Sequence, residues 1–571
     1  LTDSYDAIVM NPPYMPTSRV DVLKTYAVKN YPDSKTDLFS VFMDVCIDRL
    51  KDGGKYGMIN MQSWMFLSSF ETLRNKMLDN QHIDSLLHLG PHTFDELSGE
   101  VVQNAAFVVS KTKSSSLAVF YRLVNGGNCD AKKQLFLNGM NRYDVVDLSQ
   151  FNDIPGERLG YWMSPKSLDI FKWDTMAKYA KVRRTLQCGD VPRFTRFWFE
   201  VNNHDIAQSK DKASLINDDK HTWFRYSNGG ESRKWYGNLW EVVKWRNNGE
   251  EIKSTGRAII PNEELYFLEA VGFNRMISSK GLTARHYNSG IMFGDSTAIA
   301  VSKIDIQLLG LMNSKVCNCI LNFFNPRAAQ TGSLAEIPVS PNFDSSINQI
   351  IQQSIMLSKS DWDAHETSWD FQRNGLLDID ADKAMSIASN YSDVTGICID
   401  VAAPEPTKLE WLVGMNKMNW EAKFYRLHAN EEELNRQFIE IYGLQDELTP
   451  DVPLNEVTIL QQGEISIRDG EIVWNNDVII KQLISYMVGV WMGRYRLDRP
   501  GLNIAHPDPT EEEMASYQYG PDNATLVIDD DGIIPVLPTG APFEDNLTEY
   551  IANFVRIAWG EESQTDNLNF I

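Results

Sequence analysis

The stretch YDAIVMNPPY, residues 5–14, places the tightest limit on how this chain folds. Its first part is short and almost entirely apolar, which is typical of a buried strand in an α/β sheet. Two consecutive prolines follow, and proline can neither continue a helix nor donate to a strand ladder. The sequence therefore predicts a buried strand that ends in a stiff turn made of Asn11, Pro12, Pro13 and Tyr14.

The residues that follow alternate between helix and strand patterns. Residues 36–54 carry apolar side chains at helical spacing, with Thr36 as the expected N-cap and Gly53-Gly54 as the expected end. A further helix is expected at 69–78, and strands are expected at 55–61, 83–89 and 104–111. This alternation predicts an open, mainly parallel α/β sheet of the Rossmann-like kind, only part of which lies in the chain.

The rest of the chain differs from these N-terminal residues in its sequence pattern and in its charge. The length of 571 residues predicts several cores, which we divide into residues 1–155 (part of the α/β sheet), 156–345 (mixed α/β) and 346–571 (acidic and largely helical). Residues 1–340 carry a net charge of +3 and residues 341–571 a net charge of −26. Such an asymmetry allows a basic, nucleic-acid-binding front beside an acidic rear that would repel DNA and suits a docking surface.

Composition also excludes several classes. No uninterrupted apolar run approaches 18 residues and no secretory pattern is present, so a membrane-spanning or secreted protein is not expected. The six cysteines are scattered, which indicates reduced thiols in a cytoplasm. Only Cys317 and Cys319 are close together, and C-x-C without a second pair is a poor zinc signal, so no metal is expected.

The Asn-Pro-Pro-Tyr turn suits chemistry at a planar exocyclic nitrogen, such as that of adenine or of a carboxamide. Such a nitrogen is a weak nucleophile because its lone pair is delocalised. If the Asn11 side-chain oxygen and the Pro12 carbonyl oxygen accept its two N–H bonds, it becomes tetrahedral and its lone pair can attack a methyl group. The prolines hold both oxygens still, and Pro13 adds no competing N–H. Tyr14 supplies a flat face for an extruded base.

The residues also support a family resemblance. NPPY at the end of a strand resembles the catalytic motif of amino-methyltransferases that depend on S-adenosylmethionine. VVQNAAFVVSK (101–111) resembles a later motif of that family, which implies that Phe107 packs against the flipped adenine. The order of motifs is that of the γ class. Residues 311–341 resemble the end of the target-recognition domains of type I and type IIG restriction–modification systems. LISYMVGVWMGRYRLDRPGL (483–502) is similar to a stretch typical of the PglX methyltransferases of BREX phage-defence systems.

The resemblance to PglX covers essentially the whole chain and implies a site-specific, adenine-N6 DNA methyltransferase that flips its target base and marks host DNA in a bacterial cytoplasm. Implied partners are double-stranded DNA, other BREX proteins and phage-encoded DNA-mimic inhibitors. The family holds its cofactor on a glycine-rich loop after its first strand, and no such unit precedes Asn11. We therefore expect a C-terminal portion, with the cofactor-binding residues upstream of Leu1, that is inactive on its own.

Residues 181–300 are expected to contact DNA. They carry 18 basic and 14 acidic residues among aromatic side chains and Asn-Gly turns. Trp198, Trp235, Trp240 and Trp245 are expected in the core rather than stacked on bases. Ten cations are candidates for phosphate and base contacts: Arg183, Arg184, Arg193, Arg196, Arg233, Lys244, Arg246, Arg275, Lys280 and Arg285.

Three alternatives remain open at this stage. A type IIG restriction–modification polypeptide would carry its nuclease outside this sequence. A protein-glutamine methyltransferase uses the same turn, but it would leave the basic-aromatic region and the acidic rear without a purpose. A non-catalytic specificity or assembly subunit would retain the turn as a relic. The sequence upstream of Leu1 discriminates among them, because a cofactor loop, a nuclease motif or neither would lie there.

Overall fold

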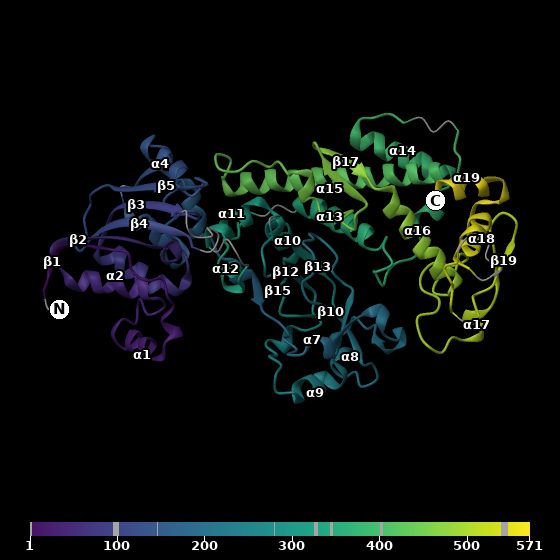
Figure 1. The fold of residues 1–571 in the computed structure, drawn as a ribbon, viewed down its shortest axis with the longest axis horizontal. Helices are drawn as coiled ribbons and strands as arrows, with labels where there is room; N and C mark the ends of the chain where they lie inside the picture. Colours follow the sequence, from purple (N-terminus) through teal and green to yellow (C-terminus); the bar gives the residue numbers. More distant parts are fainter. Residues whose placement is uncertain are drawn as a thin grey trace. The chain divides into compact units, whose positions relative to one another are not determined.

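The structure is a computed structural model of mixed α/β class with several sheets (Figure 1). It describes residues 3–94, 102–145, 147–278, 280–324, 329–342, 346–399, 403–530, 532–537 and 546–571. The chain forms two compact units. Unit 1 comprises Leu1–Lys178, Cys319–Pro341 and Tyr442–Leu444, and unit 2 comprises Tyr179–Asn318, Asn342–Ile441 and Gln445–Ile571. The expected division at residues 155 and 345 stays a prediction.

Unit 1 is built on one six-stranded sheet in the order β1-β2-β4-β3-β5-β6. Four strands, β1, β2, β3 and β5, run in one direction, and β4 and β6 run in the other. Because β4 is inserted in reverse between β2 and β3, it begins where those two strands end. The sheet is therefore more mixed than the expected parallel one. The strands are β1 (Tyr5–Met10), β2 (Leu50–Met61), β3 (His82–Gly90), β4 (Asn104–Ser110), β5 (Ala118–Arg122) and β6 (Arg142–Val145).

The helices of unit 1 confirm the expected alternation but correct two boundaries. The N-cap of α2 is Asp37 rather than Thr36, because its side chain and that of Ser40 form a reciprocal capping box. Gly53 and Gly54 do not end this helix. They lie inside β2, where Gly53 has φ of 77° and the pairing with β1 shifts register. The helices are α1 (Asp21–Asn30), α2 (Leu38–Arg49), α3 (Glu71–Asn80), α4 (Cys129–Leu137), α5 (Pro165–Leu168), α6 (Met176–Tyr179, at the boundary with unit 2) and α12 (Thr331–Ala335).

Strand β1 forms where it was expected, but it is not buried. Among the described strands it pairs with β2 alone, so it lies at an edge of the sheet. Its Val9 side chain is 88% exposed and Tyr5 is 40% exposed. An apolar run thus predicted the strand correctly and its burial wrongly, because burial depends on which elements cover the two faces.

Unit 2 contains two larger sheets, with strand orders β14-β10-β11-β8 (β9 pairing with β10) and β13-β12-β15-β7. Trp198, Trp235 and Trp245 are buried as expected, and Trp240 is half-buried. The strands are β7 (Ala180–Arg183), β8 (Thr195–Phe197), β9 (Ile206–Ala207), β10 (Trp223–Ser227), β11 (Glu241–Lys244), β12 (Ala270–Asn274), β13 (Ala284–Tyr287), β14 (Met292–Phe293) and β15 (Thr297–Ser302). Short helices connect them: α7 (Val191–Phe194), α8 (Lys212–Ile216), α9 (Arg246–Ser254), α10 (Asp305–Asn313) and α11 (Lys315–Phe324, which continues into unit 1).

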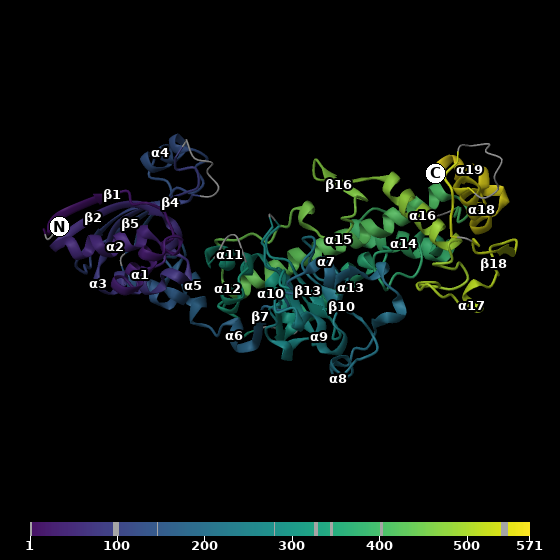
Figure 2. The ribbon, with the colours of Figure 1, turned by 60° about the horizontal axis from the view of Figure 1, so that its bottom comes forward.

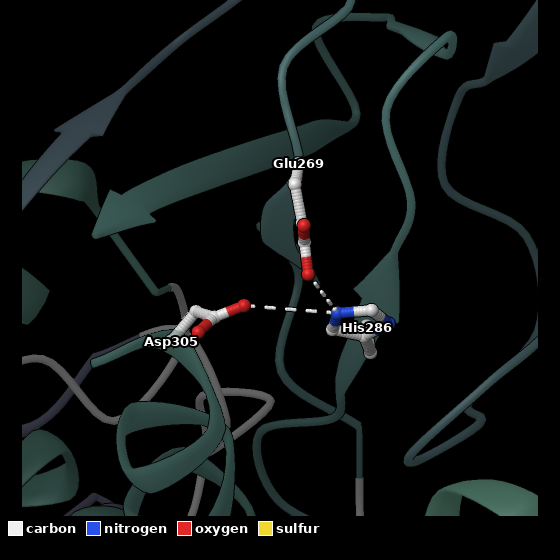
Figure 3. Close-up of side chains that lie close together, drawn as sticks. All are labelled: Glu269, His286 and Asp305. Carbon is white, nitrogen blue, oxygen red and sulfur yellow. Dashed lines mark hydrogen bonds and ion pairs between the residues drawn. The ribbon is translucent and has the colours of Figure 1, made fainter. Parts of the chain in front are cut away.

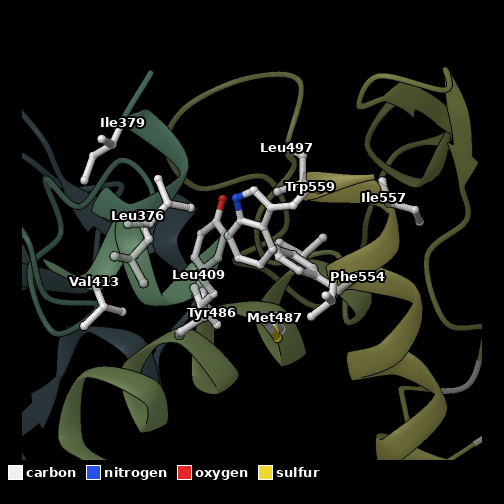
Figure 4. Close-up of a cluster of buried hydrophobic side chains, with 14 of the residues drawn as sticks. Leu376, Ile379, Leu409, Val413, Tyr486, Met487, Leu497, Phe554, Ile557 and Trp559 are labelled. Carbon is white, nitrogen blue, oxygen red and sulfur yellow. The ribbon is translucent and has the colours of Figure 1, made fainter. Parts of the chain in front are cut away.

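The C-terminal part of unit 2 is mainly helical. Helix α15 runs beside α13 (Figure 2), and Asn430 of α15 donates to Gln353 and Ser354 of α13. Apolar side chains from α14, α15, α16 and α18 form a continuous core there (Figure 4). The elements are α13 (Ser346–Trp362), α14 (Ala381–Thr395), α15 (Leu409–Tyr442), β16 (Ile465–Arg468), β17 (Glu471–Trp474), α16 (Asn476–Trp491), α17 (Glu511–Met514), β18 (Tyr517–Tyr519), β19 (Ala524–Leu526), α18 (Leu547–Trp559) and α19 (Gln564–Phe570). Within the ranges that the structure describes, no helix combines the length and the apolar character needed to cross a membrane.

Candidate active site

The Asn-Pro-Pro-Tyr turn lies directly after β1, at the edge of the sheet where β1, β2 and β3 end and β4 begins. Open α/β sheets place ligands at the carboxyl ends of their parallel strands. Asn11 and Pro13 are exposed, Pro12 is buried and Tyr14 is half-buried. Pro12 therefore anchors the turn, and the Asn11 side chain lies at the surface, where a substrate can reach it.

The Tyr14 hydroxyl has three hydrogen-bond partners. It lies 3.1 Å from Asn11 Oδ1, 3.3 Å from the Ile59 carbonyl oxygen and 3.2 Å from Asn104 Nδ2. Burial raises the pKa of Tyr14, and the bond from Asn104 offsets only part of that rise, so the hydroxyl keeps its proton at neutral pH. The ring packs edge-to-face on Phe39 at a centroid distance of 6.4 Å. Tyr14 is thus held at both its ring and its hydroxyl.

Asp37 fastens the turn to the beginning of α2. Its Oδ1 accepts from the backbone N–H of Met15 at 3.0 Å and from that of Phe39 at 3.3 Å. In addition, the Leu38 N–H donates to the Met15 carbonyl oxygen at 3.0 Å. Burial raises the pKa of Asp37, and its backbone hydrogen bonds counteract that rise. One carboxylate therefore caps the helix and fixes the chain immediately after Tyr14, a role that no local sequence signal indicated.

Two fully buried asparagines lie behind Tyr14. Asn104, the first residue of β4, donates from Nδ2 to the Asn60 carbonyl oxygen at 3.2 Å as well as to Tyr14. Asn60, near the end of β2, accepts at its own Oδ1 from Trp64 Nε1 at 3.1 Å. Asn104 is the polar residue that opens an otherwise apolar strand, and this is the signal by which the sequence could have drawn attention to it.

His88 continues this polar layer at the end of β3. Its Nε2 lies 2.8 Å from Gln62 Oε1, and its Nδ1 lies 2.9 Å from the Tyr161 hydroxyl. Burial, reinforced by the positive charges of Arg122 and Lys132, lowers the pKa of His88 to about 3. The imidazole is therefore neutral at physiological pH. Because Gln62 Oε1 can only accept, Nε2 carries the proton and Nδ1 accepts from Tyr161.

Phe107 does not occupy the position that the resemblance implied. It lies in the interior of β4, is 3% exposed and packs against Trp64 and Tyr56 at centroid distances of 5.0 and 6.0 Å. A ring enclosed by two other aromatic side chains has no open face for a base. We therefore assign Phe107 to the core and drop it as a stacking residue.

Two of the ten candidate DNA-binding cations are buried. Arg233 donates to Asp361 Oδ2 at 2.6 Å and to the backbone carbonyl of Ser358 at 3.0 Å. Arg285 is fully buried and donates to the Tyr287 hydroxyl at 2.7 Å, among other bonds. Their guanidinium groups are used within the core, so the expectation that they line a DNA surface is corrected. Residue type alone indicated charge but not burial.

The other candidates lie at or near the surface, and four of them share a carboxylate in pairs. Asp295 holds Arg184 at 2.6 Å and Arg275 at 2.7 Å. Glu251 holds Arg193 at 2.9 Å and Lys244 at 2.6 Å. Each group therefore keeps a surplus positive charge and a fixed geometry.

The remaining four candidates have no such shared carboxylate. Arg183, Arg196 and Arg246 are exposed and donate to backbone carbonyl oxygens, with no carboxylate partner among the described residues. Lys280 is half-buried. Burial and the nearby Lys234 lower its pKa, although acidic neighbours act in the opposite direction.

A second polar cluster brings together three side chains of metal-binding type (Figure 3). His286 Nε2 lies 2.9 Å from Glu269 Oε1 and 3.7 Å from Asp305 Oδ2. Burial lowers the pKa of His286, but hydrogen bonds to Asp305 and Glu269 outweigh it and raise the pKa above its usual value. The single atom His286 Nε2 lies between the two carboxylates, and we describe the three side chains as a hydrogen-bonded cluster.

The described residues do not fit the methionine and ribose of S-adenosylmethionine. No described strand–helix turn before Asn11 carries the glycines that such a cofactor requires. A hollow of about 310 Å³ beside β1 is lined by Tyr5, Ala7, Ile8, Met10, Val45, Cys46 and Arg49. This lining is mostly apolar and has no carboxylate for ribose hydroxyls. The site thus contains hydrogen-bond acceptors at the Asn-Pro-Pro-Tyr turn and no group that we assign to the cofactor.

Comparison with known proteins finds similarity to methyltransferases. Residues 1–94, which contain the turn, match the family model described as Eco57I restriction-modification methylase. The whole chain is 33% identical to the adenine-specific methyltransferase BrxX of Escherichia coli O9:H4 (strain HS), covering 100% of this chain and 45% of that protein. It is 32% identical to the adenine-specific methyltransferase PglX of Lacticaseibacillus casei (strain Zhang), covering 100% and 46%. The expected resemblance to the PglX methyltransferases is confirmed, and the chain spans less than half the length of these relatives.

Solved structures show more distant similarity. The type IIL restriction-modification enzyme MmeI in complex with DNA gives a TM-score of 0.41 at 12% identity, covering 77% of this chain and 57% of that one. A nuclease-deletion mutant of the type ISP enzyme LlaGI, in complex with a DNA substrate mimic, gives 0.37 at 11% identity, covering 62% and 41%.

Proposed function

We propose that this chain supplies the substrate-amine side of a DNA adenine-N6 methyltransferase that uses S-adenosylmethionine and marks host DNA in a BREX-type phage-defence system. The observation that carries the proposal is the Asn-Pro-Pro-Tyr turn after β1, with an accessible Asn11 side chain bonded to the Tyr14 hydroxyl. The relatives named adenine-specific methyltransferases support the choice of adenine.

The turn acts on the amine by accepting hydrogen bonds. Asn11 Oδ1 has two lone pairs, of which one receives the Tyr14 hydroxyl and the other remains for an N–H of adenine N6. The Pro12 carbonyl oxygen accepts the second N–H. With both protons held, N6 becomes tetrahedral and its lone pair points away from the ring, toward the methyl group. No base need remove a proton before the transfer, which agrees with a site made of neutral groups.

The adenine must leave the duplex to reach this turn. The Tyr14 ring provides the stacking face: the side chain is only half-buried, and its contacts with Phe39 and Asn104 hold the ring in place. S-adenosylmethionine, when bound, supplies an electrophilic methyl group on a sulfonium. None of the described residues is assigned to hold it.

We propose that DNA phosphates contact the surface cations of unit 2, namely Arg183, Arg184, Arg193, Arg196, Lys244, Arg246, Arg275 and Lys280. The paired geometry at Asp295 and Glu251 supports this assignment, because it holds two cations side by side at each position. Acidic proteins that mimic DNA would compete for the same cations. Other proteins of the defence system would dock on the acidic residues 341–571, which repel DNA.

One alternative rests on a specific observation. The match of residues 1–94 to the Eco57I restriction-modification methylases favours, as a second candidate, a type IIG polypeptide in which the same methylase accompanies a nuclease. The two candidates share the chemistry of the turn. They differ in whether the whole protein cleaves unmodified DNA in the presence of Mg²⁺.

The proposal predicts that Asn11→Ala abolishes adenine methylation by the whole protein, because the amine loses its side-chain acceptor, while sequence-specific DNA binding is kept. Transfer of a labelled methyl group from the cofactor and a DNA-binding isotherm measure the two effects. Asn80→Ala, at the exposed end of α3, is the matched control and should leave both unchanged. Retained methylation by the Asn11 variant would refute the assignment.

A further inference from the structure

The proposed role of Asn11 depends on which end of its carboxamide faces the substrate. A carboxamide has nearly the same shape after a half-turn about its last bond, but the half-turn exchanges an acceptor oxygen for a donor nitrogen. With the nitrogen toward adenine N6, two donors would face each other and the amine could not become tetrahedral. The site therefore needs a group that makes one orientation more stable than the other.

The Tyr14 hydroxyl is placed to do this, since it lies 3.1 Å from Asn11 Oδ1. A hydroxyl donates one hydrogen bond and also accepts, so contact alone does not set its direction. If its proton points to Asn11, the oxygen of the carboxamide must stay on that side. If its proton points elsewhere, Asn11 can rotate and present its nitrogen.

Asn104 sets the direction of the Tyr14 hydroxyl. Asn104 Nδ2 lies 3.2 Å from both the Asn60 carbonyl oxygen and the Tyr14 hydroxyl. A backbone carbonyl oxygen can only accept, so the group facing it must be the nitrogen, and the hydroxyl must accept from that nitrogen. The Tyr14 proton then points to Asn11 Oδ1 or to the Ile59 carbonyl oxygen, which lies slightly farther away at 3.3 Å.

Asn104 lies in the paired part of the sheet. The residue is fully buried and opens β4, and its backbone is in register with Met61 of β2 and Gly90 of β3. We propose that Asn104 is a positioning residue, which orients the Tyr14 hydroxyl as a donor and so keeps the Asn11 oxygen toward the target amine. The inference rests on the proposed function, because it deepens the role given there to Asn11.

The decisive variant is Asn104→Asp, which keeps the shape and reverses the hydrogen-bond polarity. A carboxylate only accepts, so the Tyr14 hydroxyl turns its proton toward residue 104 and Asn11 loses its donor. In the whole protein we expect the kcat for adenine methylation to fall at least about tenfold, the effect of one hydrogen bond, with the Kd for target DNA unchanged. Because a protonated carboxyl donates as the amide does, the kcat of this variant relative to wild type should rise as the pH is lowered.

Two other variants separate positioning from a packing role. Asn104→Ala leaves Tyr14 able to donate to Asn11, so we expect a smaller loss of kcat than for Asn104→Asp and no recovery at low pH. Tyr14→Phe removes the hydroxyl, so adding Asn104→Asp to it should cause no further loss. Ser110→Ala, at the other end of β4, is the control and should leave kcat unchanged.

The outcomes distinguish the two proposals. If the wild-type protein does not methylate adenine, the proposed function fails and the inference falls with it. If the wild type methylates but Asn104→Asp is no worse than Asn104→Ala, or does not recover on acidification, the inference alone is overturned. Should Asn104→Asp not fold, the cycle of Asn104→Ala with Tyr14→Phe decides, because additive losses in kcat would show that the two side chains act independently.

Discussion

At the scale of single residues, the side chains that contact Asn11 and form the polar layer behind Tyr14 are neutral. Tyr14 keeps its proton, Asn60 and Asn104 carry no charge, and His88 has a pKa lowered to about 3. The sequence located Asn11 and Tyr14 because they lie together in one motif. It did not identify Asn104, whose bond to Tyr14 spans 90 residues, and it could not show that Phe107 and Arg285 are buried.

The buried His88 predicts a pH dependence of stability. The folded chain keeps it neutral down to pH about 3, whereas an unfolded histidine takes up a proton near its usual pKa of 6.5. The free energy of opening should therefore fall as the pH is lowered below about 6.5. In His88→Gln the same free energy should be lower at pH 7 and fall less steeply. Hydrogen exchange of the β3 amides measures this, with the exposed His92→Gln as control. Parallel slopes in all three proteins would contradict it.

At the scale of elements, the turn is positioned by the ends of its neighbours: α2 holds the residue after Tyr14, and β2 and β4 hold its hydroxyl. Periodicity predicted these elements because each is defined by local patterning. It did not predict where α2 begins or that Gly53 and Gly54 lie within β2, because capping boxes and register shifts depend on individual residues. Helices α10 and α11 are likewise separated by one residue, Ser314, whose backbone is extended.

Asp37 provides the test at this scale. Asp37→Ala removes the cap of α2 and the acceptor for the Met15 N–H, so we expect unit 1 to lose about 1–2 kcal/mol of stability and adenine methylation to decrease. Asp37→Asn keeps an acceptor oxygen of the same size and should retain most of both. Local unfolding followed by hydrogen exchange of α2, together with the methylation rate, checks the pair. Equal losses in the two variants would show that the hydrogen bonds are not the cause.

At the scale of the whole molecule, the two larger sheets of unit 2 and the acidic helices form one folded unit. Lys234 and Trp235 both bond to Glu431 of α15, at 2.6 and 2.7 Å, and Arg233 bonds to Asp361 of α13. These partners are more than 120 residues apart in the chain, so charge statistics along the sequence could not reveal them. The acidic residues 341–571 therefore contribute carboxylates to the buried core next to the basic region.

Glu431→Gln should destabilise unit 2 by about 3–5 kcal/mol, because it leaves the buried Lys234 without its counter-charge. Urea unfolding monitored by tryptophan fluorescence measures the change. Glu433→Gln removes an ion pair with Arg436 that lies near the surface of the same helix, and it should cost less than about 0.5 kcal/mol. Similar costs for both variants would mean that the buried pair adds nothing beyond a surface one.

Charge removal on the proposed DNA surface should act uniformly on all sequences. Arg196→Gln is expected to weaken DNA binding and to lower the slope of log K against log salt concentration by about 1, the effect of one phosphate contact. Arg436→Gln, on an exposed part of α15, is the matched control and should leave the slope unchanged. An unaltered slope for Arg196→Gln would place the path of the DNA elsewhere.

The reversed insertion of β4 between β2 and β3 affects the order in which the candidate site forms during folding. As the chain leaves the ribosome, Asn11 and Tyr14 emerge before β3 and β4, and Asn104 joins them only after β3 is complete and β4 has returned into the sheet. Pairing over such a separation is slow, because the intervening loop must close before any contact forms. The Asn-Pro-Pro-Tyr turn therefore reaches its final arrangement late, when β4, which is synthesised after β2 and β3, inserts between them at the centre of the sheet.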